Sequence, residues 1–135
     1  MEKFRRALSR FEKALTKFKE GLTLEEELKI PREIAVEVLS KRFEYTYEAM
    51  WKAVKEALRE RGIECNSPRS CFRELLKEGI VPYSYEEILY KMVELRNTLV
   101  HIYSQEQAEE IYGKIRELPF KEAFETTLKG LKNLE

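Results

Sequence analysis

The stretch IAVEVLSKRFEYTYEAMWKAVKEAL, residues 34–58, indicates the fold most clearly. Apolar and aromatic residues recur in it every three or four positions, which is typical of one face of a long helix. The residues on this face are Ile34, Val38, Phe43, Tyr47, Met50, Trp51, Val54 and Leu58. We expect the helix to run from about residue 32 to 61. Gly62 should end it, because glycine readily adopts the left-handed backbone conformation of a helix C-cap.

The N-terminal segment predicts a second amphipathic helix. Its apolar residues follow one another at alternating steps of four and three, which places them in one narrow stripe along a helix. They are Phe4, Leu8, Phe11, Leu15, Phe18 and Leu22. Gly21 should loosen the end of this helix, and a loop through LKIP should lead to Pro31.

Start and stop signals divide the rest of the chain into further helices. Ser67, followed by a proline, is typical of a helix N-cap, and Gly79 of a helix end. Residues 84–87 and 104–107 have the spacing of capping boxes, so each should begin a helix. Pro119 should open the last one.

No alternating strand pattern competes with these helices, so the sequence predicts an all-α protein. Short connections favour an antiparallel up-and-down bundle of five to six helices. With 135 residues, 43% of them hydrophobic, the chain fits a single domain over residues 1–135. No apolar run approaches the roughly 20 residues of a membrane span, and the charged N-terminus does not look like a secretory signal. We therefore expect a cytoplasmic protein without a membrane partner.

The charge balance limits the partners that the surface could bind. There are 25 basic and 25 acidic residues, so the formal net charge is zero. Binding along a nucleic-acid backbone depends on neutralising many phosphates, which argues against a broad nucleic-acid surface and against DNA as a partner. A small local basic site for RNA remains compatible with this balance.

The two cysteines, Cys65 and Cys71, are separated by five residues, which matches no zinc motif. They could be two reduced thiols, or a disulfide that fastens a loop to the next helix. With one histidine and no aspartate in the chain, we expect no bound metal.

The segment RNTLVHIY, residues 96–103, is the polar stretch that fits a core least well. On a continuous helix Arg96 and Tyr103 would share one face, while Asn97 and His101 would stack on the adjoining face. Arginine suits phosphate oxygens, and histidine exchanges protons near neutral pH. The set therefore suits metal-independent RNA cleavage through the neighbouring 2′-hydroxyl.

Two considerations weigh against a catalytic interpretation of this segment. A histidine near a helix C-terminus can be favoured by the helix dipole alone, and Arg96 could simply pair with Glu94 or Glu106. Attack by a 2′-hydroxyl also needs both a base and an acid, whereas one chain has a single histidine. Two copies facing each other in a dimer would supply both groups.

The motif R-N-T-L-V-H-I-Y resembles the R-N-x-x-x-H core of the HEPN superfamily, and more narrowly the R-x-x-x-x-H-x-Y form of HepT toxins and nucleotidyltransferase substrate-binding proteins. The resemblance extends to RFEYTYEAMWKAVKEAL (42–58), SPRSCFRELLKEGIV (67–81) and YSQEQAEEIYGKI (103–115). Many relatives have aspartate before the Arg-Asn pair and after the tyrosine, where this chain has Leu95 and Ser104.

The resemblance implies a HEPN-like bundle that forms a homodimer with both motifs in a shared cleft. It implies a metal-independent endoribonuclease toxin of a type VII HEPN/MNT toxin–antitoxin pair. In that case Arg96 would stabilise the phosphorane charge, His101 would act as general acid and base, and Asn97 would hold the geometry.

The same resemblance implies a partner, a small MNT-type nucleotidyltransferase that acts as antitoxin. It would use ATP to transfer AMP to Tyr103, and the anionic adenylate would fill the cleft beside Arg96. The chain itself would need no cofactor. The alternative is a non-catalytic substrate-binding subunit of a two-component minimal nucleotidyltransferase.

Overall fold

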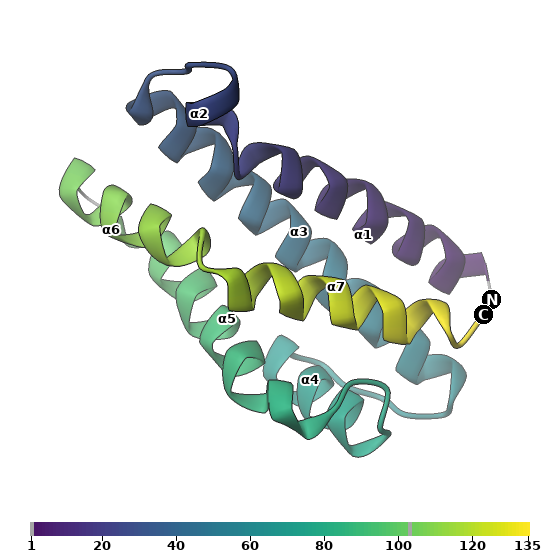
Figure 1. The fold of residues 1–135 in the computed structure, drawn as a ribbon. Helices are drawn as coiled ribbons and strands as arrows, with labels where there is room; N and C mark the ends of the chain where they lie inside the picture. Colours follow the sequence, from purple (N-terminus) through teal and green to yellow (C-terminus); the bar gives the residue numbers. More distant parts are fainter. Residues whose placement is uncertain (1, 103) are drawn as a thin grey trace.

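The computed structural model describes residues 2–102 and 104–135 and builds them into helices joined by short connections (Figure 1). The all-α fold predicted from the sequence is therefore confirmed. The elements are α1 (Glu2–Gly21), α2 (Leu24–Glu27), α3 (Arg32–Glu60), α4 (Pro68–Lys77), the 3-10 helix η1 (Tyr83–Tyr85), α5 (Glu86–Leu99), α6 (Gln105–Ile115) and α7 (Leu118–Lys132). No described helix is long and apolar enough to cross a membrane.

Helix α3 lies at the centre of the molecule, with α1 and α7 on one side and α4 and α5 on the other (Figure 1). Aromatic rings fill the space between α1, α3 and α7. The Phe43 ring of α3 lies 6.3 Å from Phe18 of α1 and 5.8 Å from Phe124 of α7, measured between ring centroids. Burial of such side chains stabilises the fold by roughly 1.5–3 kcal/mol each, which makes this cluster the main apolar core.

Most of the predicted ends of the helices are confirmed. Gly62 and Gly79 follow α3 and α4 with φ angles of +80° and +71°, the left-handed conformation that favours glycine. Ser67 caps α4 by accepting a hydrogen bond from the backbone N–H of Ser70 at 3.2 Å, and Ser104 caps α6.

The structure differs from the sequence predictions at several places in its helices, and its described residues form seven α-helices rather than five to six. The predicted capping box at 84–87 is wrong: η1 leads directly into α5, whose N-cap residue makes no side-chain capping bond. The single turn α2 was expected to be a loop. Ile34 is 48% exposed, because Ala35 and Val36 take the buried positions at the start of α3.

Cys65 and Cys71 form a disulfide, so the alternative of two reduced thiols is wrong. The bond joins the segment after α3 to the first half of α4. Both residues are buried against the core.

Two glycines on the last helices have opposite surroundings. At Gly130, in α7, a Cβ atom would overlap the backbone oxygen of Ile80, so α7 lies against the segment that follows α4. At Gly113, in α6, a Cβ atom would meet nothing within 4 Å.

Candidate functional site

Arg96 lies on α5 with its side chain directed towards α3. Its Nε atom is 3.8 Å from Oε1 of Glu48 on α3, too far for a hydrogen bond. The same Nε is buried and has no hydrogen-bond partner within residues 2–102 and 104–135. The alternative in which Arg96 pairs with Glu94 or Glu106 is therefore wrong, because Arg96 faces Glu48 on the neighbouring helix.

Glu48 is held in place by a second contact. Its Oε2 atom accepts a hydrogen bond from the indole Nε1 of Trp51 at 3.2 Å, one helical turn further along α3. One carboxylate thus connects the indole of α3 to the charge of Arg96 on α5.

Asn97 and His101 are both exposed. Helix α5 ends at Leu99, and the backbone N–H of His101 donates to the carbonyl of Thr98 at 2.9 Å, closing a turn. The prediction that a regular helix continues through His101 is therefore wrong. Tyr103 lies outside the described residues.

The structure brings Arg96, Asn97 and His101 to one end of α5, just before Ser104 begins α6. Arg96 and Asn97 are successive residues and point about 100° apart around the helix axis. Arg96 faces inward to α3, whereas Asn97 and His101 face solvent. A single chain therefore presents an inward guanidinium and an outward imidazole from the same helix end.

Tyr47 and Glu48 are adjacent residues of α3, and with Arg96 of α5 they form the group that we call the α3–α5 seam. Burial raises the pKa of Tyr47 well above its usual range, and the charge of Glu48 adds to this. The positive charges of Arg96 and Arg69 act on the same pKa in the opposite direction.

A second group of polar residues joins α2, α3 and α6, and we call it the α2–α6 clamp: Glu25, Glu26, Arg32, Tyr112 and Arg116. Arg116 donates to Glu26 at 2.6 Å. The Tyr112 hydroxyl and Arg32 both donate to Glu25, at 3.2 and 3.4 Å. The two guanidinium groups lie over the Tyr112 ring, 5.3 and 5.1 Å from its centroid.

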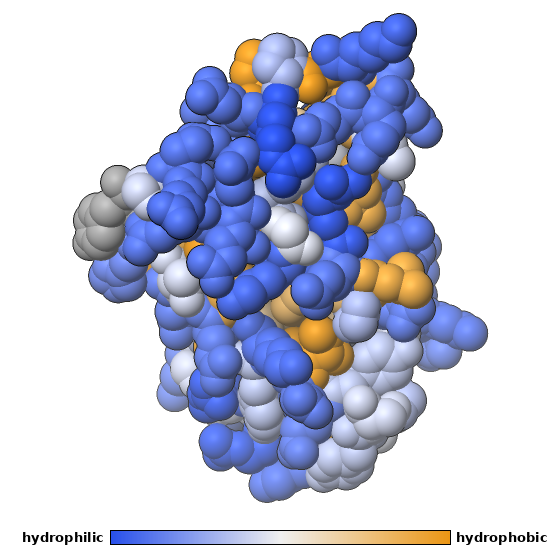
Figure 2. All heavy atoms as spheres, turned by 60° about the vertical axis from the view of Figure 1, so that its left-hand side comes forward, coloured by the Kyte–Doolittle hydropathy of each residue, from blue (hydrophilic) through white to orange (hydrophobic). Residues whose placement is uncertain are grey.

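The contacts of the clamp shift the pKa values of Glu26 and Tyr112. The hydrogen bond from Arg116 holds the pKa of Glu26 below its usual value of 4.5. Burial raises the pKa of Tyr112, so its hydroxyl stays a hydrogen-bond donor. Figure 2 brings forward the side of the molecule on which α2 and α6 lie, and its surface is largely hydrophilic.

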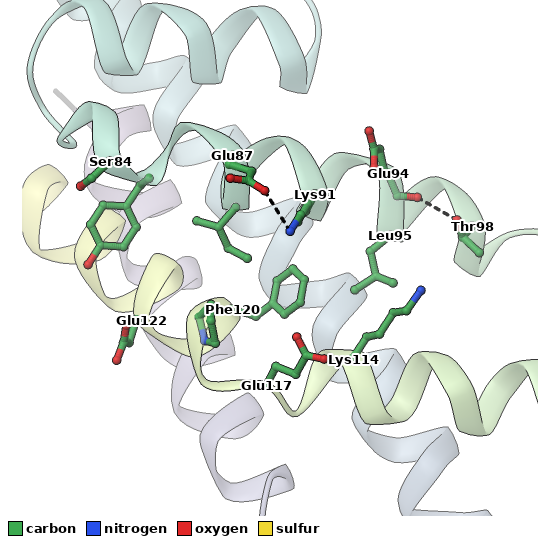
Figure 3. A pocket seen from close by; sticks show the side chains of 13 residues that line it. Ser84, Glu87, Lys91, Glu94, Leu95, Thr98, Lys114, Glu117, Phe120 and Glu122 are labelled. Carbon is green, nitrogen blue, oxygen red and sulfur yellow. Dashed lines mark hydrogen bonds and ion pairs between the residues drawn. The ribbon is translucent and has the colours of Figure 1, made fainter.

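A groove of about 740 Å³ runs between α5 and the start of α7 (Figure 3). Leu95 and Phe120 form part of its apolar floor, and Lys91, Glu94 and Lys114 are among the charged residues that line it. The residues of α5 in this groove lie on a different face of the helix from Arg96. This groove and the predicted site residues therefore do not coincide.

The described residues include no group of three or more His, Cys, Asp or Glu side chains placed to hold a metal ion. The sequence analysis did not identify Glu48 as a neighbour of Arg96. Glu48 lies in a segment that resembles the family, at the T-Y-E of residues 46–48. Only the packing of α3 against α5 shows that Glu48 and Arg96 meet.

Comparisons with known proteins agree with the resemblance found in the sequence. The family model described as "Nucleotidyltransferase substrate binding protein like" matches residues 1–133. A crystal structure of a protein from Thermus thermophilus is similar with a TM-score of 0.78 and 32% sequence identity, over 90% of this chain and 98% of that chain. No curated protein matches the chain. The chain therefore belongs to the nucleotidyltransferase substrate binding protein-like family.

Proposed function

We propose that this protein is a HEPN-type, metal-independent endoribonuclease toxin whose site is built from Arg96, Asn97 and His101. The observation that carries the proposal is the state of Arg96. Its buried Nε has no hydrogen-bond partner among the described residues, and its nearest carboxylate is 3.8 Å away. A guanidinium that was only structural would be expected to fill such a donor, because an unpaired buried polar group costs roughly 1–3 kcal/mol.

The reaction would proceed by attack of an RNA 2′-hydroxyl on the adjacent phosphorus. A base takes the proton of that hydroxyl while the bond from phosphorus to the 5′-oxygen breaks, and an acid protonates the departing oxygen. The products are a 2′,3′-cyclic phosphate and a 5′-hydroxyl. Arg96 would stabilise the charge on the phosphorane, and His101 would move protons.

A single histidine cannot be the base and the acid in the same step, so the proposal requires two copies of the chain. His101 from each protomer of a homodimer would line a shared cleft. The exposure of Asn97 and His101 at the end of α5 supports this arrangement, because a second copy could reach both side chains.

The proposed partner is an MNT-type nucleotidyltransferase that acts as antitoxin in a type VII pair. It would transfer AMP from ATP to the hydroxyl of Tyr103 and release pyrophosphate. The added phosphate would lie two residues from His101 and carry a negative charge into the site. Such a group would compete with RNA for Arg96.

The test is cleavage of RNA by purified protein in EDTA, with wild type beside His101→Ala and Arg96→Ala. We expect cyclic phosphate ends from wild type and losses of about 10²-fold or more in each variant. Arg116→Ala is the matched control, since Arg116 is also partly buried and ion-paired but belongs to the clamp. Equal activity in all four proteins would contradict the assignment of the site.

A second candidate function is a non-catalytic subunit that presents substrate to the nucleotidyltransferase. The description of the family favours it, as does the groove of about 740 Å³ on the other face of α5. This candidate predicts no cleavage by the unmodified dimer, together with a dependence of nucleotidyl transfer on groove residues such as Lys91. Charge reversal by Lys91→Glu, assayed for nucleotidyl transfer and for cleavage, separates the two functions.

A further inference from the structure

We infer that the exposed face of α1, together with Tyr45 of α3, binds the RNA strand where it leaves the α3–α5 seam. Basic side chains of α1 bind the phosphates of single-stranded RNA, and the Tyr45 ring stacks with a base. The inference rests on the proposed function for the identity of the ligand. It adds a second region to a site that the sequence placed entirely on residues 96–103.

The charges of the chain are distributed unevenly. Helix α1 contains seven basic and three acidic residues, which gives it a formal charge of +4. Because the formal charge of the whole chain is zero, all the other residues together carry −4. A chain that is neutral in total therefore has one strongly positive helix.

Five of the basic residues lie along one face of α1, and we call them the basic row. They follow one another at steps of three and four residues, so they are neighbours on the helix surface over a length of about 21 Å. The row is centred roughly 140° around the helix from the buried apolar stripe, and all five residues are exposed. They are Lys3, Arg6, Arg10, Lys13 and Lys17.

The protein does little to neutralise the basic row. Arg6 pairs with Glu2 at 3.6 Å, and both side chains are more than half exposed. Lys17 pairs with Glu20 at 3.4 Å in the same way. The other three members have no carboxylate within ion-pair distance in the described part of the chain. Ion pairs between exposed side chains contribute little to stability, so a phosphate can replace the glutamate.

The contacts of α1 with α7 show on which side of the helix the basic row lies. Glu12 pairs with Lys132 of α7. Lys19 pairs with Glu125 of the same helix at 2.6 Å. The row is centred roughly 150° around α1 from Glu12 and Lys19. It therefore lies on the side away from α7 and borders α3, which packs along α1 (Figure 1).

Tyr45 lies between the basic row and the seam. Nη1 of Arg42 on α3 donates to the backbone carbonyl of Lys17 at 2.8 Å, so Arg42 faces α1. Glu48 of α3 faces Arg96 of α5. Arg42, Tyr45 and Glu48 are three residues apart, so each points about 60° further around α3 than the one before. Tyr45 therefore lies on the outward face of α3 between α1 and α5, and it is 61% exposed.

Single-stranded RNA is the ligand that fits both parts of this surface. Its phosphates pair with a row of cations, and its bases stack on exposed aromatic rings. An acidic protein would fit the cations but would not account for the exposed ring between the row and Arg96. The apolar face of α1 is buried in the core, so this helix has no apolar face to insert into a membrane.

Binding of 2′-O-methyl oligoribonucleotides, which lack the attacking hydroxyl, tests the surface without cleavage. Lengths of about 4 and about 12 nucleotides distinguish the seam alone from the seam together with α1. By fluorescence anisotropy, the double variant Arg10→Ala, Lys13→Ala should bind the longer oligonucleotide about tenfold more weakly. The slope of log K against log salt should fall in magnitude by about 1.4, which corresponds to two phosphate contacts on a single strand. Binding of the shorter oligonucleotide should not change.

Variants of Tyr45 test the stacking contact. Tyr45→Ala should weaken binding of the longer oligonucleotide about tenfold, because it removes the ring. Tyr45→Phe keeps the ring and should bind like wild type. Equal losses of affinity in these two variants would contradict stacking of a base on the ring.

The matched control is the double variant Arg5→Ala, Lys129→Ala, which removes the same charge from exposed positions of α1 and α7 outside the row. If both double variants bind the longer oligonucleotide equally well, the inferred surface is wrong. It is also wrong if Arg10→Ala, Lys13→Ala weakens binding of both lengths by the same factor. A variant that keeps its affinity for RNA but loses affinity for the cognate nucleotidyltransferase would make the row a protein interface and would overturn the inference.

The failure of this surface and the failure of the proposed function have different signatures. With unmodified RNA of the longer length, Arg10→Ala, Lys13→Ala should raise KM and leave kcat nearly unchanged, because these contacts are made equally in the ground and transition states. If wild type cleaves no RNA yet binding of the longer oligonucleotide depends on the basic row, the ribonuclease is wrong and the surface stands. If cleavage depends on His101 but KM does not depend on the row, the surface alone is wrong.

Discussion

The α2–α6 clamp and the α3–α5 seam contain the same kinds of residue in different states. Each contains a buried tyrosine together with arginine and glutamate, two of each in the clamp and one of each in the seam. In the clamp, Arg116 and Tyr112 have hydrogen-bonded carboxylate partners at 2.6 and 3.2 Å. In the seam, the ion pair between Arg96 and Glu48 is 3.8 Å long, and the buried Nε of Arg96 has no hydrogen-bond partner among the described residues.

Under the proposed function, this difference separates residues that hold the fold from residues that would bind RNA. A hydrogen bond to a charged group contributes roughly 1.5–3 kcal/mol when it is made, so a satisfied cluster stabilises the helices that it joins. In a cluster with unpaired donors, the same hydrogen bonds can form with a ligand instead and then contribute to the free energy of binding. The types of residue alone do not distinguish the two clusters, whereas their distances do.

The largest expected contrast between the two regions is in RNA cleavage. Arg96→Ala should lower kcat by about 10²-fold or more, since it removes a charge that stabilises the transition state. Arg116→Ala should leave kcat near the wild-type value and lower the free energy of unfolding instead. Single-turnover rates in EDTA measure cleavage by both variants, and urea denaturation measures their free energy of unfolding. If kcat fell by a similar factor in the two variants, the two regions would not differ in their role in cleavage.

The disulfide between Cys65 and Cys71 gives the next largest effect. Reduction of Cys65–Cys71 should lower the free energy of unfolding by about 2 kcal/mol, because the bond closes a short loop and restricts the unfolded chain. Urea denaturation with and without dithiothreitol measures this loss. A protein with both cysteines changed to serine is the control and should not respond to the reductant. An equal response of the two proteins would contradict the prediction.

Removal of a single hydroxyl compares the two buried tyrosines directly. Tyr112→Phe deletes the hydrogen bond to Glu25 and should lower the free energy of unfolding by about 1 kcal/mol. Tyr47→Phe deletes a hydroxyl without a partner in the described structure, so its stability should stay close to wild type. Thermal and urea denaturation of the two variants measure these changes in the free energy of unfolding. An equal loss in both variants would mean that the Tyr47 hydroxyl also stabilises the fold.

The smallest effect is a dependence of the clamp on acid. The pKa of Glu26 is lowered in the folded protein, so its ion pair with Arg116 contributes stability above the unfolded pKa near 4.5. This contribution is lost as the pH falls through the lowered folded pKa. Wild type should therefore lose more stability than Arg116→Ala when the pH falls from about 5 to 3. If both proteins lost the same stability over this pH range, the ion pair of Glu26 with Arg116 would not contribute to stability.

The sequence predicted those parts of the fold that depend on local chemistry. Gly62, Gly79 and Ser67 end or begin helices for reasons that lie within a few residues of each. The same local reasoning failed at 84–87, where a 3-10 turn replaced the capping box. It also failed to detect α2, which is a single turn and therefore has no hydrophobic period of its own.

The candidate site was predicted in part, for a similar reason. Arg96, Asn97 and His101 lie close together along the chain, so one motif identifies them. Glu48 comes from another helix, and its approach to Arg96 depends on the axial position of α3 relative to α5. Hydrophobic periodicity gives the face of a helix but does not give its register against a neighbour.

The glycines of the last two helices determine how freely each position can vary. At Gly130 any side chain would push α7 away from the backbone of Ile80, so this position should accept no other residue without loss of packing. At Gly113 alanine would meet no atom and would raise the helix propensity of α6 by about 1 kcal/mol. In a saturation library selected for folding, position 130 should remain glycine while position 113 diversifies. Gly130 is thus required because the backbone of Ile80 leaves no room for a side chain. Gly113 has no such neighbour, so its only effect is to make α6 less stable than alanine at the same position would.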